Sequence, residues 1–315
     1  MNKNSKIYIA GHTGMVGSNV LDKLKASGYN NLITASHKEL DLLNTSQVVN
    51  YFRTNQLDYC FLCAAKVGGI LSSNNYQADF IYQNTMIQTN IIKCCHDFHV
   101  KKLMFLGSSC CYPKNAIIPI KEDSLSCGPL EETNVGYSTA KINGIMMCQM
   151  FNKQYDDNFI SVMPCNLYGK NDRYHLNNGH VFPTLIMKIH NALINNLPFI
   201  ELWGTGGTMR EFLFAEDLVD AMITLMNNYD DPEIINIGTG EDISILDLVK
   251  KMCQIIGYKG QIVFDNSKPD GVYRKVLDIS KISKYWQPST SLEEGIRKAY
   301  NAYVAFIERR VAHDK

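Results

Sequence analysis

The sequence has no excess of charge of either sign. Its 315 residues include 31 lysine and arginine residues and 31 aspartate and glutamate residues, and no long run of one sign occurs. This balance argues against a nucleic-acid groove and against a polybasic membrane patch. We therefore expect no nucleic-acid partner, and any anionic substrate must be bound by a few placed cations.

Long apolar runs are also missing. The opening segment MNKNSKIYIAG has only a short apolar stretch before its glycine, which is too short for the apolar region of a signal peptide. No later segment approaches the roughly 20 apolar residues that a membrane-spanning helix needs. The sequence therefore predicts no membrane association.

A spaced cysteine framework is missing as well. The ten cysteines include two pairs of sequence neighbours, Cys94–Cys95 and Cys110–Cys111. Such spacing suits a reduced compartment better than a disulfide scaffold. We expect a cytoplasmic protein, and we assign no metal site.

What is present is a globular composition with strand-like and helix-like segments in alternation. With 45% hydrophobic and 20% charged residues, the chain has enough apolar material for a large core and two domains. The expected strands of the first half are KIYIAG, NLITAS, LDYCFLCAA and VKKLMFLGSS, and the expected helices are MVGSNVLDKLKASG, TSQVVNYFRTNQ and NTMIQTNIIKCCHDF. This order predicts an α/β fold, a doubly wound parallel sheet of the Rossmann type.

The second half is less regular. A polar loop rich in glycine and asparagine follows SVMPCNLYGKND, and the segment EIINIGTG is typical of one more strand of the first sheet. We therefore predict a dinucleotide-binding domain over residues 1–168, to which the chain returns around 212–240. A smaller mixed α/β substrate-binding lobe is expected over 169–211 and 241–315.

The most informative spacing is GHTGMVG, directly after a strand-like run and directly before a helix-like one. Glycine lets the backbone turn sharply and approach a pyrophosphate, while a helix N-terminus supplies unpaired N–H groups and a favourable dipole. A glycine-rich turn is often only a turn, but its context here predicts dinucleotide binding. The candidate residues are Gly11, His12, Thr13, Gly14, Met15, Val16 and Gly17.

The end of the second strand-like run should select between NAD and NADP. An acidic residue there would accept hydrogen bonds from the ribose hydroxyls of NAD and would repel a 2′-phosphate. The segment TASHKEL has no acid until Glu39 and offers a cation and donors instead, which favours NADP(H). A solvated loop is the alternative for the histidine alone. The candidates are Ser36, His37 and Lys38, with Asp41 and Leu42 beside the adenine.

A tyrosine and a lysine stand four residues apart at the start of the helix-like run YSTAKINGIMMCQMF. Tyr137 and Lys141 would share one helix face. A phenol with a pKa near ~10 is a poor acid or base at neutral pH, but a nearby ammonium group and an oxidised nicotinamide favour the phenolate. The spacing alone occurs by chance in many helices. Together with the glycine-rich loop and Ser108 at a strand end, it predicts a site that exchanges a proton with a substrate carbonyl.

These motifs resemble the extended short-chain dehydrogenase/reductase family over essentially the whole chain. The segments that carry the resemblance are AGHTGMVGS, AAKVGGI, NTMIQTNII, LGSSCCYPK, YSTAKINGI, SVMPCNLYG, GHVFP, WGTGGTMREFL and PDGVYRKVLD. The resemblance is greatest to members that invert carbons 3 and 5 of a GDP-4-keto-6-deoxy sugar and then reduce its ketone with NADPH. It implies NADP(H) as the cofactor, a GDP-sugar as the substrate, and a homodimer formed through a four-helix bundle.

The resemblance also implies the roles of the catalytic residues. Ser108 and Tyr137 would polarise the ketone oxygen at carbon 4, which stabilises each enolate and later the alkoxide. Cys110 and His180 would act on the carbons themselves, because a thiol and an imidazole both titrate near neutrality. Without the resemblance, Cys110 would be read as packing and His180 as a surface residue. Neighbours on a strand point to opposite faces, so Cys111 is expected to pack.

Further binding residues follow from the same resemblance. The remaining cofactor contacts would be Ala64, Leu106, Gly107, Lys141, Pro164, Asn166, Leu167 and His180, and the GDP-sugar contacts would be Lys188, Trp203, Arg210 and Asp270. Two cations suit a pyrophosphate, and an indole can pack against a ring. For Arg210 the alternative is an ion pair with Glu211 or Asp217. Some relatives have an arginine in place of Thr13, which could help to hold the 2′-phosphate.

Other functions stay open. A different NDP-sugar 4-ketoreductase or 4-epimerase would use the same fold with Tyr137 and Lys141. A dehydratase would need an acidic pair after the serine, which Ser109 and Cys110 cannot supply. A non-enzymatic NADP(H)-binding regulator is a further alternative, and the presence of Ser108, Tyr137 and Lys141 together argues against it.

Overall fold

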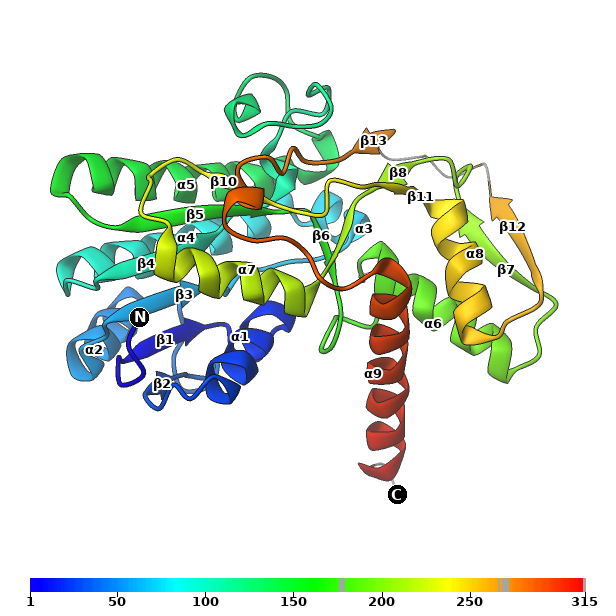
Figure 1. The fold of residues 1–315 in the computed structure, drawn as a ribbon, viewed down its shortest axis with the longest axis horizontal. Coiled ribbons are helices and arrows are strands. Elements are labelled where there is room, and N and C mark those ends of the chain that lie inside the picture. Colours follow the sequence, from blue (N-terminus) through cyan, green and yellow to red (C-terminus); the bar gives the residue numbers. More distant parts are fainter. Residues whose placement is uncertain (176–178, 266, 268–271, 314–315) are drawn as a thin grey trace.

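The computed structural model describes residues 1–175, 179–265, 267 and 272–313 (Figure 1). Its larger lobe contains a six-stranded sheet in the order β10-β5-β4-β3-β1-β2, and every neighbouring pair of strands is parallel. The strands are β1 (Ile7–Ala10), β2 (Leu32–Ile33), β3 (Tyr59–Leu62), β4 (Lys102–Leu106), β5 (Phe159–Pro164) and β10 (Ile235–Ile237). The predicted α/β fold with a parallel sheet is confirmed.

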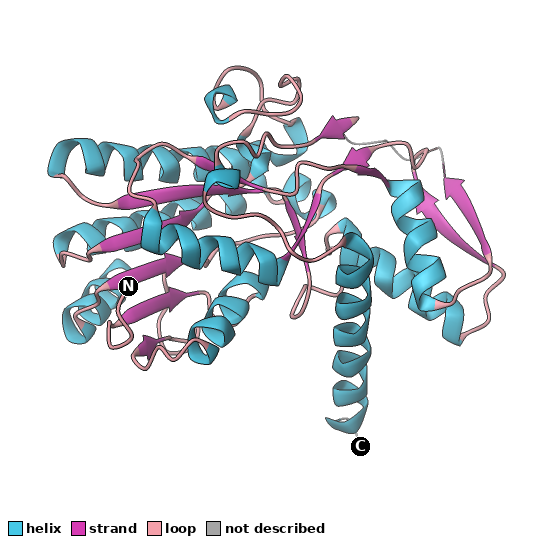
Figure 2. Cartoon of the chain, in the orientation of Figure 1, coloured by secondary structure: helices cyan, strands magenta, loops and turns pink. Residues whose placement is uncertain are grey.

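Helices cover both faces of this sheet (Figure 2). One group pairs α1 with α7, and the other places α4 between α2 and α5. The helices of the larger lobe are α1 (Met15–Ala26), α2 (Thr45–Asn55), α3 (Ile70–Asn75), α4 (Gln77–Asp97), α5 (Val135–Tyr155) and α7 (Ala215–Asn228). Short 3-10 helices are η1 (Ser109–Cys111), η2 (Glu122–Ser124), η3 (Glu132–Asn134) and η4 (Ile282–Lys284).

The smaller lobe has its own apolar core, to which Phe182, Ile189, Phe212, Met252 and Ile296 belong. Its helices are α6 (Val181–Ile194), α8 (Ile245–Ile256) and α9 (Leu292–His313). Three small sheets accompany them: β7 (Phe199–Trp203) with β12 (Gln261–Asp265), β6 (Asn166–Tyr168) with β9 (Phe212–Phe214), and β8 (Met209–Arg210) between β11 (Ile243–Ser244) and β13 (Arg274–Lys275). The domain boundaries stay a prediction, and we propose the two apolar cores as the centres of the two domains.

Two expected strands are shorter in the structure than in the prediction. The run NLITAS contributes only Leu32–Ile33, because β2 lies at the edge of the sheet and pairs with β1 alone. The run VKKLMFLGSS forms a strand only over Lys102–Leu106, and the chain then turns into η1. The polar residues after Leu106 therefore emerge at the carboxyl end of β4, where the sequence places them.

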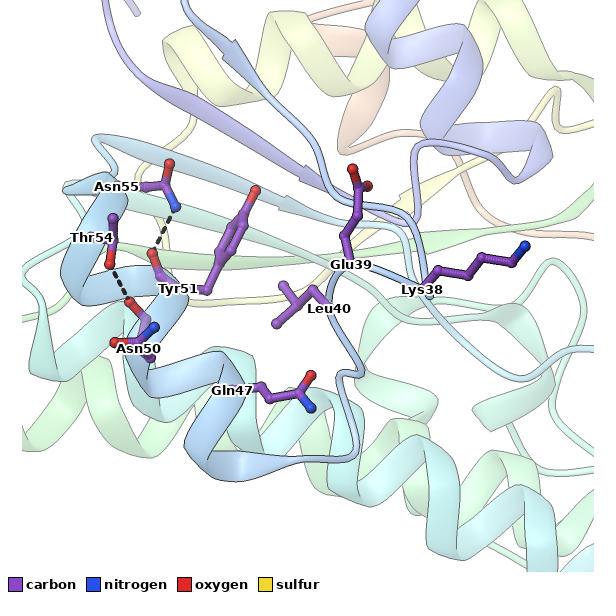
Figure 3. Close-up of a pocket in the computed structure, with 8 residues that line it drawn as sticks. All are labelled: Lys38, Glu39, Leu40, Gln47, Asn50, Tyr51, Thr54 and Asn55. Atoms are coloured by element: carbon purple, nitrogen blue, oxygen red, sulfur yellow. Dashed lines mark hydrogen bonds between the residues drawn. The ribbon is translucent and has the colours of Figure 1, made fainter.

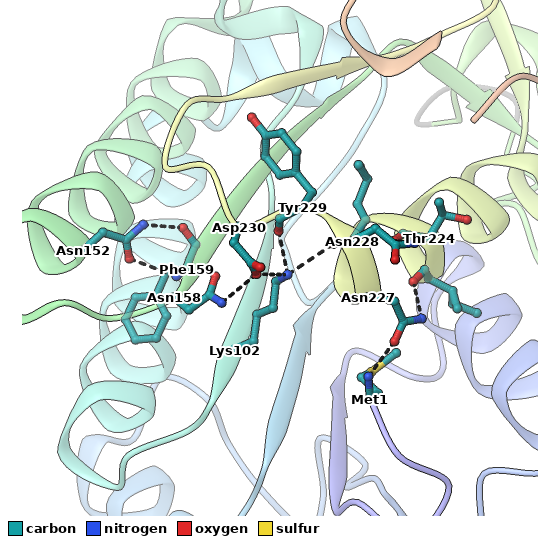
Figure 4. A network of polar contacts seen from close by, with 12 residues as sticks. Met1, Lys102, Asn152, Asn158, Phe159, Thr224, Asn227, Asn228, Tyr229 and Asp230 are labelled. Carbon is teal, nitrogen blue, oxygen red and sulfur yellow. Dashed lines mark hydrogen bonds and ion pairs between the residues drawn. The ribbon is translucent and has the colours of Figure 1, made fainter. Parts of the chain in front are cut away.

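A buried lysine fixes α7 to the sheet (Figure 4). The Lys102 ammonium donates hydrogen bonds to the carbonyl oxygen of Tyr229 at 2.6 Å and to Asp230 Oδ1 at 2.8 Å. It also lies 3.3 Å from the carbonyl oxygen of Leu225, in the last turn of α7. The carbonyl groups that end a helix have no partner within the helix and attract a cation. Lys102 therefore satisfies the C-terminus of α7 from the first residue of β4.

Candidate active site

The loop between β1 and α1 is a tight turn that only glycine permits. Gly11 has a φ of +83°, and a Cβ atom at Gly17 would lie 2.2 Å from the carbonyl oxygen of Gly11. Gly14, the N-cap residue of α1, provides no side-chain cap, and the first turn of α1 contains no acidic residue. The N–H groups at this helix end are therefore open to an anion.

A buried polar atom at the same loop also lacks a protein partner. The Nδ1 atom of His12 is buried and makes no hydrogen bond within the described part of the chain. An open helix N-terminus, a glycine turn and a buried imidazole nitrogen fit the diphosphate of a dinucleotide. Met15 and Val16 begin α1, and Ala64 lies 2.7 Å from the Cβ position of Gly11.

In the loop after β2, the chain turns so that the carboxylate of Glu39 contacts Ser36. Glu39 Oε2 accepts hydrogen bonds of 2.7 Å from both the backbone N–H and the hydroxyl of Ser36. These bonds hold the pKa of Glu39 below its usual value. His37 Nδ1 lies 3.9 Å from Asp41 Oδ1. No motif indicates that Glu39 turns toward Ser36, because the contact depends on the turn at 36–39.

A shallow depression of about 340 Å³ lies beside this turn (Figure 3). It is lined by Lys38, Glu39 and Leu40 together with the α2 residues Gln47, Asn50, Tyr51, Thr54 and Asn55. Lys38 points away from the α2 side chains in this view. None of the catalytic candidates lines the depression, so it does not mark the reaction centre.

Thr13 opens onto a second pocket, of about 230 Å³. Two cations line it with Thr13: Lys170, from the loop after β6, and Arg309, from α9. Lys170 also forms an ion pair with Asp22 at 3.0 Å. The pocket contains one acid, Asp172, and burial raises the pKa of this carboxyl to about 7. Sequence reasoning missed Arg309, because nothing in the motif near Thr13 indicates a residue so far along the chain.

Tyr137 and Lys141 lie in the first two turns of α5, on the side that faces β4. The Lys141 ammonium donates a hydrogen bond of 2.6 Å to the carbonyl oxygen of Leu106 and lies 5.9 Å from the centre of the Tyr137 ring. Burial lowers the pKa of Lys141 to about 8. Burial raises the pKa of Tyr137, as does the nearby Cys110, while a hydrogen bond with Ser108 acts in the opposite direction. The structure thus brings Ser108, Tyr137 and Lys141 together.

The two neighbouring cysteines differ in burial. Cys110 is partly exposed, and its backbone N–H donates to Ser108 Oγ at 3.2 Å. Cys111 is fully buried, which raises the pKa of its thiol to about 12. Cys111 therefore packs, as predicted, but the reason given from strand alternation is wrong, since both cysteines lie in the 3-10 helix η1.

His180 is the N-cap residue of α6, and part of its surface is exposed although protein atoms surround its imidazole. Desolvation, followed by the positive charge of Arg173, lowers the pKa of its imidazole. Arg173 also donates a hydrogen bond of 3.3 Å to the carbonyl oxygen of Val67. Sequence reasoning did not consider Arg173, which follows Asp172 in a loop without a motif.

The other cofactor candidates lie along the carboxyl edge of the sheet. Gly107 follows β4, and its N–H donates to the carbonyl oxygen of Val162 at 2.8 Å. Pro164 ends β5, while Asn166 and Leu167 belong to β6. Ligands of open α/β sheets bind outside the carboxyl ends of the strands. The position of these residues is consistent with that rule.

Asn84 supports the site from α4. Its side chain accepts from the N–H of Lys66 at 2.8 Å and donates to the carbonyl oxygen of Lys66 at 3.0 Å. It also donates to the carbonyl oxygen of Phe80 at 2.8 Å, and the Phe80 ring meets the Tyr137 ring edge-on. Asn84 therefore holds the segment AAKVGGI directly and reaches Tyr137 only through Phe80.

The GDP-sugar candidates lie in the smaller lobe. Lys188 on α6 donates a hydrogen bond of 2.9 Å to the carbonyl oxygen of Glu201, and burial lowers the pKa of its ammonium group. Trp203 ends β7 with 51% of its surface exposed. Arg210 lies in β8 and donates to the carbonyl oxygen of Met209 at 2.7 Å. Asp270 lies outside the described residues.

Glu211 and Asp217, the alternative ion-pair partners of Arg210, accept hydrogen bonds from other groups. Glu211 accepts from the N–H groups of Thr239 and Gly240 at 2.6 and 2.7 Å, and from that of Leu277 at 2.9 Å. Burial raises the pKa of Glu211 to about 7. Asp217 accepts from Ser289 and Thr290. Each of these two carboxylates therefore connects its own segment to a distant part of the chain.

The described residues contain no group of three or more histidine, cysteine or acidic residues that could hold a metal ion. Within the same ranges, no helix combines the length and the apolar character that crossing a membrane requires.

Comparisons with known proteins identify relatives over nearly the whole chain. The profile of the NAD dependent epimerase/dehydratase family matches residues 7–238. A GDP-L-fucose synthase of Sinorhizobium fredii is 47% identical over 301 residues, which cover 95% of this chain and 96% of the relative. A GDP-L-fucose synthase of Escherichia coli is 44% identical over 309 residues, covering 95% and 96%. A solved structure described as a GDP-mannoheptose C4 reductase from Campylobacter jejuni, with NADP bound, has a TM-score of 0.90 at 37% identity, covering 96% of this chain and 99% of that one.

Proposed function

The chain belongs to the NAD dependent epimerase/dehydratase family, and from that premise we propose that it converts GDP-4-keto-6-deoxy-D-mannose to GDP-L-fucose. The reaction inverts carbons 3 and 5 and then reduces the ketone at carbon 4 with NADPH. The observation that supports it best is the group formed by Ser108, Cys110, Tyr137 and Lys141 at the carboxyl end of β4. The two GDP-L-fucose synthases at 44–47% identity point to the same substrate.

The cofactor we propose is NADP(H), which supplies a hydride to carbon 4 when bound. The loop from Gly11 to Gly17 would hold its diphosphate at the open N-terminus of α1. A 2′-phosphate would be recognised by Lys38, two residues after Ser36, or by Lys170 and Arg309, which line a pocket with Thr13. They supply positive charge that Thr13 itself does not.

Tyr137 would donate a proton to the ketone oxygen during reduction. Burial raises the pKa of Tyr137 and so keeps the phenol protonated, which is the form needed to donate. The hydroxyl of Ser108, hydrogen-bonded to Tyr137, would supply a second donor to the same oxygen. The Lys141 ammonium stabilises the phenolate that remains after the proton has left.

Cys110 and His180 would invert the two carbons. Each inversion needs one group to remove the proton on one face of the sugar and another group to return a proton on the opposite face. The lowered pKa of His180 leaves its imidazole neutral at pH 7 and able to accept a proton. The enolate formed at each step carries its charge on the ketone oxygen, beside Ser108 and Tyr137.

The GDP portion of the substrate would lie in the smaller lobe. Lys188 and Arg210 would bind the diphosphate, and Trp203 would pack against a ring of the nucleotide or sugar. We keep Asp270 as a proposed acceptor for sugar or base donors.

We also propose a cytoplasmic homodimer. All ten cysteines are free, which fits a reducing compartment. α4 exposes Ile81 and Tyr82, and α5 exposes Met146 and Met150, so the paired helices present apolar side chains that a second copy would cover. Sedimentation should then give twice the 35.7 kDa mass of one chain, and a monomer mass would refute the dimer.

The function is tested by supplying purified protein and NADPH with GDP-4-keto-6-deoxy-D-mannose or with a UDP-linked 4-keto sugar. We expect NADPH oxidation with the GDP-sugar and a product with the configuration of L-fucose. NADPH oxidation that leaves carbons 3 and 5 unchanged would favour the second candidate, a 4-ketoreductase. That candidate is favoured by the likeness to the GDP-mannoheptose C4 reductase.

A further inference from the structure

The first turn of α5, which carries Tyr137, is not capped by its own N-terminal residue. The side chain of Asn134, the N-cap residue, makes no capping hydrogen bond, and the first turn contains no acidic residue. The first N–H groups of a helix have no partner within the helix and need a cap or water. The partner for this turn, if it is not water, comes from another part of the chain.

Gln77, the first residue of α4, supplies that partner. Its Oε1 atom accepts a hydrogen bond from the N–H of Gly136 at 3.2 Å, and its Nε2 atom donates to the carbonyl oxygen of Glu132 at 3.0 Å. Glu132 begins η3, and Gly136 is the second residue of α5. One carboxamide therefore binds both sides of the turn that leads into the catalytic helix.

The two helix ends approach each other as closely as glycine allows. A Cβ atom at Gly136 would lie 2.4 Å from the carbonyl oxygen of Gln77, a separation that real Cβ atoms do not show. Any other residue at position 136 would push α5 away from α4 and lengthen the hydrogen bond to Gln77. The backbone of residue 77 thus requires glycine at position 136, and the Gln77 side chain adds a hydrogen bond to the Gly136 N–H.

Tyr137 is held by the same end of α4. It directly follows Gly136, and its ring meets the ring of Phe80 edge-on, with centroids 6.4 Å apart and an interplanar angle of 76°. Phe80 lies one turn beyond Gln77 on α4. The start of α4 therefore contacts both the backbone before Tyr137 and the phenol ring.

We propose that Gln77 is a positioning residue for Tyr137, whose carboxamide fixes the first turn of α5 and so places the phenol beside Ser108 and Lys141. The contact itself does not depend on the identity of the substrate, but its effect on rate rests on the proposed function. A misplacement of about 1 Å in a reacting group can cost roughly 10²-fold in rate. Without the Gln77 hydrogen bonds the turn would fray for part of the time, so we expect a smaller loss of rate.

The test uses two substitutions and a matched control. Gln77→Met keeps the length of the side chain and removes both hydrogen bonds. Gln77→Glu keeps an acceptor for the Gly136 N–H and adds a negative charge at a helix N-terminus, which is favourable, but it loses the donor to the carbonyl oxygen of Glu132. Gln154→Met makes the first change at an exposed position near the other end of α5.

We expect Gln77→Met to lower kcat for ketone reduction about tenfold while the Kd for NADPH stays unchanged. Gln77→Glu, which keeps one of the two hydrogen bonds, should recover part of the rate, and Gln154→Met should have no effect. In a Tyr137→Phe background, Gln77→Met should cause no further loss, because Gln77 acts through the phenol. An equal loss in both backgrounds would overturn the proposal.

Hydrogen exchange at the Gly136 amide gives a readout that does not need activity. Exchange should be at least about tenfold faster in Gln77→Met than in the unchanged protein, and an unchanged rate would overturn the proposal. If Gln77→Met does not fold, the comparison of Gln77→Glu with Gly136→Ala, which breaks the same contact by a clash, decides instead. A protein that reduces no GDP-linked ketosugar would refute the proposed function, while the exchange rates would still decide whether the contact holds the helix.

Discussion

The ammonium nitrogen of Lys141 lies 5.9 Å from the centre of the Tyr137 ring. The same nitrogen is tied to the carbonyl oxygen of Leu106 at 2.6 Å, so α5 and the end of β4 hold it in place. The pair that the spacing Tyr-x-x-x-Lys predicts is thus assembled at the edge of the sheet. Since burial raises the pKa of Tyr137 and lowers that of Lys141 to about 8, the lysine should lose its proton first as pH rises.

The rate of ketone reduction should therefore fall as pH rises through about 8 in the free enzyme. Loss of the Lys141 proton removes the positive charge that stabilises the phenolate left after proton transfer. A profile of kcat/KM against pH measures this decrease. Lys141→Arg, which keeps its charge at high pH, should shift the decrease to higher pH, and Lys153→Arg on the exposed side of α5 should not. A decrease that stays at about pH 8 in Lys141→Arg would contradict the assignment.

Glu39→Gln should strengthen the binding of NADPH. The Glu39 carboxylate turns back onto Ser36, where the 2′-phosphate is expected, and two negative groups repel each other. We expect the Kd for NADPH to fall severalfold, while the Kd for NADH changes little. Glu233→Gln, an exposed site near the end of α7, is the control. Equal changes for both cofactors would show that Glu39 does not face the 2′-phosphate.

The local motifs of the site could be predicted because each is written in adjacent residues. The glycines at 11 and 17 are required by the turn itself, and a helix places Tyr137 and Lys141 on one face whatever surrounds it. Cys111 shows the limit of such reasoning. Its burial is as expected, yet the strand alternation used to infer it does not exist, because the chain forms a 3-10 helix at that point.

The contacts that could not be predicted join residues far apart in sequence or depend on one side-chain conformation. Gln77 binds residues 55 and 59 positions away, and Arg309 reaches the pocket of Thr13 from the last helix. Glu39 is only three positions from Ser36, but its return depends on the local turn. No periodicity or motif signals contacts of these kinds.

The stability of the protein should decrease as pH rises from about 4.5 to about 7 through the titration of Glu211. Its pKa is raised from an ordinary value of 4.5 to about 7 in the folded state, so the folded protein binds more protons than the unfolded chain in this window. The free energy of unfolding contributed by this group is therefore present at low pH and is lost as pH rises, with roughly 3 kcal/mol as an upper bound.

Urea unfolding at several pH values within that window measures the slope. Glu211→Gln should be less stable overall, since an amide cannot replace a carboxylate that accepts three backbone N–H groups, and its pH slope should be flatter. Glu216→Gln, at an exposed position in α7, should keep the original slope. An unchanged slope in Glu211→Gln would mean that other groups dominate the pH dependence.

Lys102→Met should destabilise the protein by about 2 kcal/mol. The substitution leaves the carbonyl oxygen of Tyr229 buried without its donor, and a lost partner of this kind costs roughly 1–3 kcal/mol. The matched control is Lys101→Met, whose side chain is 63% exposed and forms a surface ion pair with Asp58. The control should change the free energy of unfolding much less than Lys102→Met does, because a surface ion pair contributes little to stability. Similar losses in the free energy of unfolding in both variants would show that the buried contacts of Lys102 at the end of α7 contribute nothing special.

The measurement that tests the central claim most directly is the reaction with GDP-4-keto-6-deoxy-D-mannose and NADPH in heavy water, with carbons 3 and 5 of the product read by NMR. The account predicts deuterium at both carbons together with NADPH oxidation. It also predicts loss of that deuterium in Cys110→Ala and its retention in Cys127→Ala, whose thiol is exposed. Reduction that leaves both carbons without deuterium would contradict the account, because Cys110 and His180 would then take no part in the chemistry.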